Sequence, residues 1–125
     1  FTWVEAVQYC ESMGGFLAVI TDEAENSNVT AIAKTLNPSR PRSFWIGGAD
    51  LGHEGTFRWI STDDIVLYVG GFAENQPNDN GAPYGQVCLI LDANFNFMWN
   101  DFDCQQFIAP LCEIDEITKD AIDGE

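Results

Sequence analysis

The sequence predicts an α+β domain in which two helices come first and a set of antiparallel strands follows. Two segments with helical periodicity precede Pro41, and short apolar segments beyond it alternate with stretches rich in Gly, Pro, Asn and Asp. Helices and strands that are segregated along a chain in this way are typical of the α+β class. With 125 residues and 46% apolar content, the chain has the size of one domain that can bury a real core.

The first helix is expected from Thr2 to Met13. Thr2 can serve as its N-cap, because Glu5 three residues later completes a capping-box pattern, and Gly14 and Gly15 end the helix. Its apolar residues recur on one face and would place a cysteine against the core. They are Trp3, Ala6, Val7 and Cys10.

The second helix is expected to open at Thr21 or Asp22, with acids in its first turn, and to stop before Pro38. Its apolar stripe consists of Val29, Ile32, Ala33 and Leu36. Seven short strands are predicted outside the helices, at Phe16–Ile20, Phe44–Gly47, Phe57–Ile60, Val66–Tyr68, Val87–Leu91, Phe97–Trp99 and Phe107–Cys112.

Large aromatic residues dominate the expected core, namely Trp45, Trp59 and Trp99. The stretch from Gly70 to Gln86 contains many Gly, Pro, Asn and Asp residues and is expected to form one long irregular loop. Loops of that length in a compact domain are usually either functional or disordered.

Four cysteines form an even set, which permits three pairings from the sequence alone: Cys10, Cys88, Cys104 and Cys112. Their spacing lacks a zinc-binding pattern, so two disulfides in an oxidising compartment are the better account. No apolar stretch approaches the ~20 residues of a membrane span, and no signal peptide is seen. We therefore expect a secreted protein or a trimmed ectodomain. Asn28-Val29-Thr30 is a sequence that can accept an N-linked glycan.

A net charge of −15 argues against nucleic acid and against insertion into anionic membranes. Residues 115–125 form an acidic tail that we expect to be flexible, as a stalk or linker would be. Arg40 and Arg42 flank Pro41 and make the only basic patch, for which the simplest interpretation is a solvated loop.

An ordered series of motifs runs through the chain from Thr2-Trp3 and Glu5-Ala6 to Cys112-Glu113. Its other members are Gly14-Gly15-Phe16-Leu17-Ala18-Val19-Ile20, Trp45-Ile46-Gly47-Gly48, Glu54-Gly55-Thr56-Phe57-Arg58-Trp59, Gln76-Pro77-Asn78 and Trp99-Asn100-Asp101, together with the four cysteines. The series resembles the C-type lectin domain family over roughly residues 1–114, with the first strand of that domain missing or truncated. The resemblance implies two helices packed on antiparallel sheets, a long calcium-binding loop and disulfides Cys10–Cys112 and Cys88–Cys104.

The family's sugar-binding calcium site uses five side chains. By position they correspond to Gln76, Asn78, Gln86, Asn100 and Asp101. Only Asp101 is a carboxylate, where sugar-binding members generally have three, and fewer charged ligands lower the affinity for Ca²⁺. The resemblance therefore implies a weak calcium site, on which Gln76, Asn78, Gln86 and Asn100 would also hydrogen-bond the sugar. Tyr84 can cover the apolar face of a sugar, or it can simply pack the loop.

A neighbouring auxiliary calcium site of the family corresponds to Asp50, Glu54 and Asp79, while Val87 replaces a further carboxylate. The alternative for these acids is that they are exposed loop residues in a very acidic protein. Gln76 and Asn78 are both amides, so the order of donors and acceptors does not choose between mannose-type and galactose-type sugars.

Catalysis is not expected, because His53 is the only histidine and no nucleophile motif surrounds it. The predicted function is calcium-dependent glycan binding at this loop, weak for a single sugar and strengthened by oligomers or tandem modules. The resemblance implies a role in innate defence. The alternative is a lectin-like module that binds a protein partner, with calcium absent or only structural.

Overall fold

The computed structural model describes residues 1–36, 38–50, 56–73 and 87–114. Two helices, a short 3-10 helix and seven strands occupy these residues. They are α1 (Trp3–Ser12), β1 (Gly15–Leu17), α2 (Glu23–Thr35), β2 (Phe44–Ala49), β3 (Arg58–Trp59), β4 (Val87–Asp92), η1 (Ala93–Phe95), β5 (Met98–Asp103), β6 (Ala109–Pro110) and β7 (Cys112–Ile114). Within the described segments, neither helix has the length and hydropathy needed to span a membrane.

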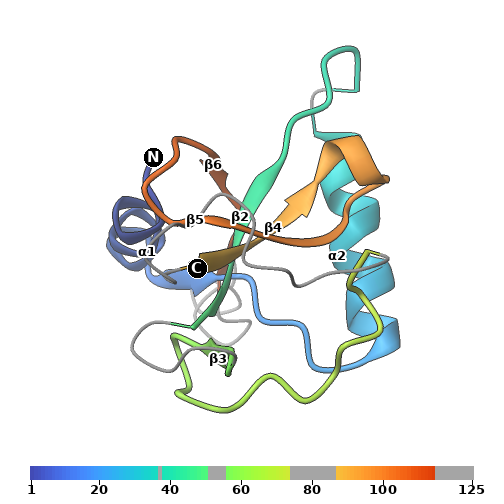
Figure 1. The fold of residues 1–125 in the computed structure, drawn as a ribbon. Helices are drawn as coiled ribbons and strands as arrows, with labels where there is room; N and C mark the ends of the chain where they lie inside the picture. Colours follow the sequence, from blue (N-terminus) through green and yellow to red (C-terminus); the bar gives the residue numbers. More distant parts are fainter. Residues whose placement is uncertain (37, 51–55, 74–86, 115–125) are drawn as a thin grey trace, which may run out of the picture.

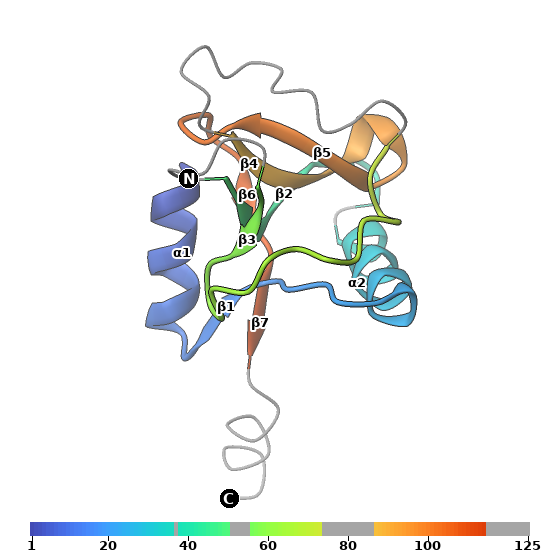
Figure 2. The same cartoon turned by 60° about the horizontal axis from the view of Figure 1, so that its bottom comes forward.

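The strands form one large and one small sheet. The large sheet has the order β3-β2-β4-β5. Strand β6 pairs with the start of β2, at Phe44 and Trp45. The small sheet consists of β1 and β7, which run antiparallel. Figures 1 and 2 show α1 and α2 on opposite sides of the molecule with the strands between them. The α+β class is thus confirmed. Among the described strands β2 and β6 pair in parallel, Phe72 and Trp99 form an isolated parallel bridge, and the other strand pairs are antiparallel.

Strand β4 is buried along its whole length because a helix and its core cluster lie on each side. Side chains alternate between the two faces of a strand. Val87, Leu89 and Leu91 therefore join the cluster that contains Val29 of α2. Cys88 and Ile90, which point to the other face, join the cluster that contains Trp3, Ala6 and Cys10 of α1. This two-sided burial explains why β4 reads as a continuous apolar run instead of an alternating one.

Helix α1 begins with the predicted capping box. The Thr2 N–H donates to Glu5 Oε1 over 2.9 Å, and the Glu5 N–H donates to Thr2 Oγ1 over 3.3 Å. Helix α1 ends at Ser12 with Met13 as its C-cap, and the chain then turns at Gly14, whose φ of +79° is a left-handed conformation that glycine adopts readily. The indole N–H of Trp3 donates to the Ile46 carbonyl over 3.0 Å, which ties α1 to β2.

Both disulfides implied by the family resemblance are present. Cys10 of α1 is joined to Cys112 of β7, and Cys88 of β4 is joined to Cys104 just after β5. The first bond spans 102 residues of sequence and fixes the C-terminal strand to the opening helix.

The predicted aromatic core is confirmed. Trp45, Trp59 and Trp99 are all buried, and the rings of Trp59 and Trp99 meet edge to face with centroids 5.8 Å apart. The indole N–H of Trp45 donates to the Phe1 carbonyl over 2.9 Å, so burial leaves no unpaired donor on this ring.

Several local predictions were wrong. No strand forms at Val66–Tyr68, where Ile65 makes a single bridge to Arg58 and Val66 N–H donates to the Phe57 carbonyl. The predicted strand Phe107–Cys112 is split into β6 and the start of β7, because Ala109 and Pro110 pair with β2 of the large sheet whereas Cys112 pairs with β1 of the small one. In α2, Val29 and Ala33 are buried but two other members of the predicted stripe are exposed, namely Ile32 and Leu36.

The turn into β5 also differs from the prediction of a strand at Phe97. Asn96 and Phe97 both have positive φ, of 56° and 62°, so the chain reverses there and β5 begins at Met98. Asparagine tolerates this left-handed conformation better than most residues. The acidic tail and most of the predicted long loop lie outside the described residues.

Candidate ligand-binding site

The structure describes three of the predicted site residues: Asp50, Asn100 and Asp101. They lie on or next to the large sheet, at strands β2 and β5. The remaining predicted site residues lie outside the described residues. They are Gln76, Asn78, Asp79, Tyr84, Gln86 and Glu54.

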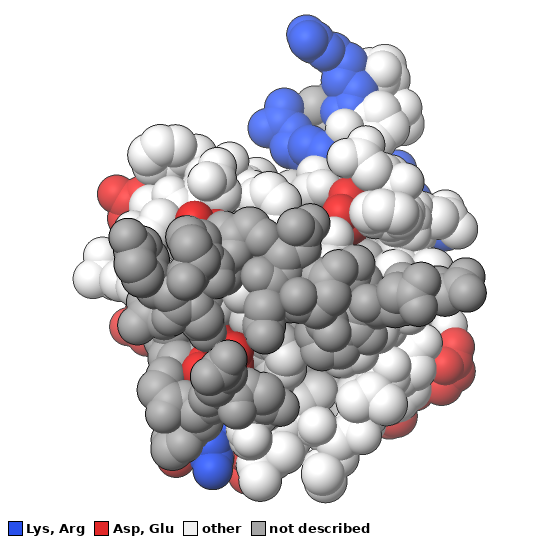
Figure 3. Space-filling model, in the orientation of Figure 1, with Lys and Arg blue, Asp and Glu red and all other residues white. Residues whose placement is uncertain are grey.

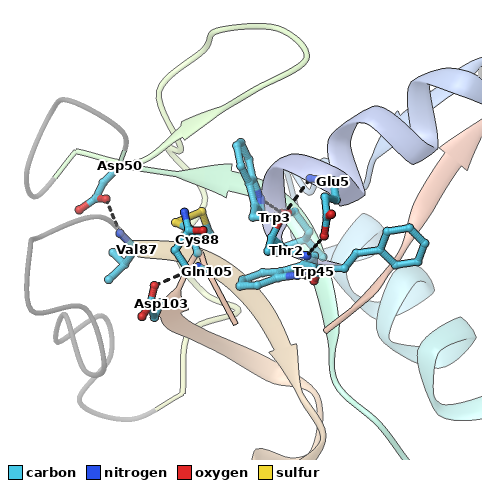
Figure 4. The surroundings of a disulfide bond; sticks show 12 residues. Thr2, Trp3, Glu5, Trp45, Asp50, Val87, Cys88, Asp103 and Gln105 are labelled. Atoms are coloured by element: carbon cyan, nitrogen blue, oxygen red, sulfur yellow. Dashed lines mark hydrogen bonds between the residues drawn. A yellow bond between two sulfur atoms is a disulfide. The ribbon is translucent and has the colours of Figure 1, made fainter. Parts of the chain in front are cut away.

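Asp50 follows β2 and holds the first residue of β4. Its N–H donates to the Val87 carbonyl over 3.1 Å, and its Oδ1 accepts from the Val87 N–H over 2.9 Å. The side chain is only 1% exposed. Figure 4 shows the carboxylate of Asp50 pointing at the start of β4, next to the Cys88 disulfide. Asp50 therefore fixes one end of residues 74–86, because the chain leaves that segment at Val87.

Trp99 fixes the other end of the same segment. Its N–H donates to the Gly71 carbonyl over 2.7 Å, and its carbonyl accepts from the Ala73 N–H over 2.9 Å. The Phe72 and Tyr68 rings pack edge to face against its indole, with centroids 5.1 and 5.7 Å away. Ala73, just before residues 74–86, is thus bonded to Trp99 of β5, and Val87, just after them, is bonded to Asp50. Trp99 and Asp50 lie on opposite sides of β4.

Asp101 is completely buried, with 0% exposure. It lies on β5 opposite Leu89 of β4. Directly opposed residues of antiparallel strands point to the same face, so Asp101 shares the face of Leu89 and Trp99. Asp50 lies opposite Val87 and Asp101 lies opposite Leu89, so the two acids flank β4 from either side with an offset of two residues. Two strand spacings and two residue rises put their backbones about 12 Å apart. The structure brings these two carboxylates to one region of the sheet.

Asn100 points the other way. It pairs with Ile90, and successive residues of a strand face opposite sides, so its amide lies on the face away from Asp101. Its Nδ2 donates to Asp92 Oδ2 over 3.0 Å. Its Oδ1 is buried and has no hydrogen-bond partner within the described residues. The structure thus places Asn100 next to Asp101 along β5 but sends the two side chains to opposite faces.

Asp92 is a residue of this region that the sequence did not single out. It is buried, and its Oδ1 accepts from the Asn94 N–H over 2.9 Å and from Ser43 Oγ over 3.5 Å. The signal was present, since an aspartate that ends an apolar strand and bonds a backbone N–H two residues later is a common turn pattern. Asp92 orients the amide of Asn100 and so decides where its oxygen is directed.

The ligand chemistry of the three residues fits a hard cation such as Ca²⁺. All of them offer oxygen atoms, which Ca²⁺ prefers. The buried Oδ1 of Asn100 is an acceptor that either a cation or an ordered water would satisfy. Within the described residues, however, no group of three or more His, Cys, Asp or Glu side chains lies close enough to hold a metal ion. A complete calcium shell would need ligands from residues 74–86.

Tyr68 and Glu113 both have raised pKa values. The hydrogen bond that the Tyr68 hydroxyl donates to Glu23 raises the pKa of Tyr68. Burial raises the pKa of Glu113, although its Oε1 accepts a hydrogen bond from the Val19 N–H over 2.9 Å. Both lie away from Asp50 and Asp101 in the sequence, and neither adds a candidate ligand to the site.

With this fold and this geometry, the chain belongs to the C-type lectin domain family, whose model matches residues 1–114. The chain is 34% identical over 102 residues to a perlucin-like protein of the mussel Mytilus galloprovincialis. That match covers 82% of this chain and 62% of the mussel protein, so the chain spans less than two thirds of that relative's length.

Solved structures agree with the family. The carbohydrate-recognition domain of cow CD23, determined in the presence of a GlcNAc2Man3 oligosaccharide, superposes with a TM-score of 0.73 at 28% identity. That match covers 90% of this chain and 78% of the CD23 chain. A calcium-independent type II antifreeze protein superposes with a TM-score of 0.70 at 26% identity, covering 89% of this chain and 76% of the other. The chain is thus a binding domain of a non-enzymatic family, and one protein that shares its fold is described as calcium-independent.

Proposed function

We propose that the domain binds glycans at the end of the sheet marked by Asp101, with Ca²⁺ as the bridging ion. The observation that carries this proposal is the pair of buried carboxylates, Asp50 and Asp101, on the two strands that flank β4. Ala73 and Val87, which border the stretch with Gln76, Asn78 and Gln86 in the sequence, are bonded to Trp99 and Asp50. We assign the remaining ligands of the shell around Asp101 to these three amides. Ca²⁺ bound there would supply open coordination positions for two sugar hydroxyls.

The protein's own residues would orient the sugar. Amide groups both donate and accept, so Gln76, Asn78 and Gln86 can each pair with a hydroxyl that also touches the ion. Asn100 can do so only if its amide leaves Asp92, to which it now donates. With a single formal carboxylate in the primary shell, the affinity for Ca²⁺ is expected to be in the millimolar range. Useful binding of glycans then requires several domains acting together.

We place Asp50, with Glu54 and Asp79, at an auxiliary calcium position that stabilises the loop without touching sugar. We also propose an extracellular location. Two disulfides support it, because such bonds persist in oxidising compartments. Relatives named as salivary C-type lectins of a mosquito support it as well. A part in glycan recognition during innate defence is consistent with that location.

The test is isothermal titration of Ca²⁺, followed by mannose, fucose and galactose in excess Ca²⁺. Asp101→Asn removes the charge at nearly constant volume and should abolish sugar binding, while Asp50→Asn, the matched control, should weaken Ca²⁺ binding and leave the choice of sugar unchanged. Chelation should release the sugar from the wild type. Sugar binding that survives both chelation and Asp101→Asn would refute the proposal.

A second candidate function has its own support. The chain resembles a calcium-independent antifreeze protein in fold, and Gln86 and Val87 stand where the family has acidic ligands. In that case the same surface binds a protein partner, with calcium absent or only structural. Partner binding that is unchanged by chelation and by Asp101→Asn would favour this function over the first.

A further inference from the structure

A groove lies at the end of β2 that is remote from Asp50. It has a volume of about 590 Å³ and runs between residues 38–43 and the segment that leads into β6. Its lining includes Arg40, Arg42, Ser43 and Phe107. The loop of residues 38–43 projects at the top of Figure 1, and Lys and Arg side chains gather at the same place in Figure 3. Of the predicted calcium ligands that the structure describes, namely Asp50, Asn100 and Asp101, none lines this groove.

Backbone pairing joins the two walls of the groove. Phe44 and Trp45 of β2 pair with Ala109 and Pro110 of β6, which ties the two walls together. The Ile108 N–H donates to the Phe1 carbonyl over 2.9 Å. On the other wall, Ser43 Oγ accepts from the Ala93 N–H over 3.0 Å. The arginines that flank Pro41 therefore sit next to a wall held by backbone pairing.

The charge of the groove is opposite to that of the rest of the protein. The chain carries a net charge of −15 and has only five Lys and Arg residues, two of which line this groove. Arg40 and Arg42 are exposed, and neither forms a salt bridge with any residue that the structure describes. In a chain with 20 acidic residues, two neighbouring guanidinium groups are thus left to face solvent.

We propose that this groove binds the anionic group of an acidic sugar, such as a sulfate ester or a carboxylate, without calcium. Guanidinium groups bind sulfate-like and carboxylate oxygens through pairs of parallel hydrogen bonds. Arg40 and Arg42, two residues apart on one wall of the groove, offer two such groups. The Phe107 ring is 79% exposed and offers an apolar surface for the sugar ring. The volume is that of a small-ligand site, which commonly measures about 300–1,000 Å³.

The net charge of the protein favours a small anionic ligand over an extended one. A net charge of −15 repels an extended polyanion such as nucleic acid or a long sulfated polysaccharide. At physiological ionic strength charges are screened beyond about 8 Å, so a single anionic sugar at the arginine pair is attracted locally. The groove adjoins Phe44, at the opposite end of β2 from Asp50, about 17 Å along a strand of this length. Binding there is therefore independent of the calcium-dependent function proposed above.

The experiment is a titration of the protein in EDTA with galactose 6-sulfate, followed by isothermal calorimetry or by NMR. Unsulfated galactose, inorganic sulfate and an Asp/Glu-rich peptide serve as comparison ligands. The sulfated sugar should bind in EDTA, and Arg40→Gln/Arg42→Gln should weaken it about 10-fold or more, because both charge-assisted hydrogen-bonding partners are lost. Arg58→Gln is the matched control, since Arg58 lies outside this groove beside Asp63, and it should leave binding unchanged.

Phe107→Ser should weaken the sulfated sugar and leave inorganic sulfate unaffected, because the ring touches only the sugar. The thermal midpoints of the Arg40, Arg42 and Phe107 variants should match the wild type, since these three side chains are exposed. Absence of binding in EDTA, or binding that survives Arg40→Gln/Arg42→Gln, would overturn the proposal. Tighter binding of the acidic peptide than of the sulfated sugar, or equal binding of inorganic sulfate, would overturn the assignment to a sugar.

Discussion

The amide of Asn100 is held by the carboxylate of Asp92 through a hydrogen bond of 3.0 Å on the face of the sheet opposite Asp101. Two residues that are adjacent in a motif are thereby separated in function. Asp101 can contribute to a ligand shell next to Trp99, whereas Asn100 contributes to a buried polar network with Asp92 and Ser43. This division follows from the regular pairing of β4 with β5, which leaves no bulge to turn both side chains to one face.

Asp92→Ala should destabilise the fold by about 1–3 kcal/mol, because it leaves the buried Asn100 amide without its acceptor. It also removes the partner of the Asn94 N–H in the turn before β5. The measurement is urea unfolding followed by tryptophan fluorescence. Asp92→Asn is the matched control, since its amide oxygen can still accept one of these bonds, and it should cost less. Equal stability of Asp92→Ala and the wild type would contradict this view of the network.

Two neighbouring glycines should respond very differently to alanine. A Cβ at Gly15 would lie 2.1 Å from the Glu113 carbonyl oxygen, a backbone atom of β7 that no rotamer change can move. Gly15→Ala should therefore force β1 and β7 apart at a cost of about 3 kcal/mol or more. At Gly14 nothing lies within 4 Å, so Gly14→Ala should cost only about 1 kcal/mol, from its positive φ. Chemical denaturation of both variants tests the order.

The two disulfides should contribute unequally. In the chain-entropy model, Cys10–Cys112, which spans 102 residues, stabilises by about 4–5 kcal/mol, and Cys88–Cys104, which spans 16, by about 3 kcal/mol. The measurement compares the unfolding free energies of the two double Cys→Ala variants in urea. Cys88 and Cys104 are both buried, so replacing them also leaves a cavity. This cavity reduces the difference in unfolding free energy between the two double variants. A larger loss from the second pair would show that packing, and not loop closure, dominates.

Glu113 should make the fold less stable as the pH rises. Burial raises its pKa above the ordinary value of 4.5, so the folded state holds a proton that the unfolded state releases. The stabilisation from the protonated form is complete below pH 4.5 and is lost as the pH passes through the raised pKa. Glu113→Gln can still accept from the Val19 N–H. Relative to the wild type, this variant should therefore gain stability as the pH increases from 4 to 7.

Glu5 is a control in which stability should change with pH in the opposite direction, because its pKa is lowered. Its hydrogen bond from the Thr2 N–H lowers the pKa of Glu5, so the stability that it contributes is present above pH 4.5 and is lost on acidification. Glu5→Gln should therefore lose stability relative to the wild type above that pH and match it below. Unfolding curves of both variants at several pH values would contradict this account if the two differences had the same sign.

The elements that the sequence predicted correctly have strong local signals. The capping box at Thr2 and Glu5, the left-handed end at Gly14 and the apolar run of β4 each depend on residues close in sequence. The pairing of the cysteines came only from the family resemblance, because four cysteines allow three pairings. Fold and disulfides were thus accessible before the structure.

Features set by tertiary contacts were not predictable. Val66–Tyr68 has strand composition but finds only a single bridge, and Ile32 has helical periodicity but no partner that buries it. The parallel pairing of β6 with β2 joins residues 65 positions apart, which no local pattern reveals. At the site, the motif Trp99-Asn100-Asp101 was recognised, but the face that each side chain takes depends on strand register.

Calcium should stabilise the folded domain in proportion to its occupancy. A ligand that binds only the folded state adds RT ln(1 + [Ca²⁺]/Kd), which for a Kd of about 1 mM and about 10 mM Ca²⁺ is about 1.4 kcal/mol. The measurement is the thermal midpoint in EDTA and in increasing CaCl2, with MgCl2 at equal ionic strength as the control. Asp101→Asn should remove the rise in thermal midpoint that comes from Ca²⁺ at the sugar-binding site. Asp50→Asn should remove only the rise that comes from Ca²⁺ at the auxiliary site. A midpoint that rises equally in both variants and the wild type would mean that neither carboxylate binds the ion, and the calcium-dependent function would fall with it.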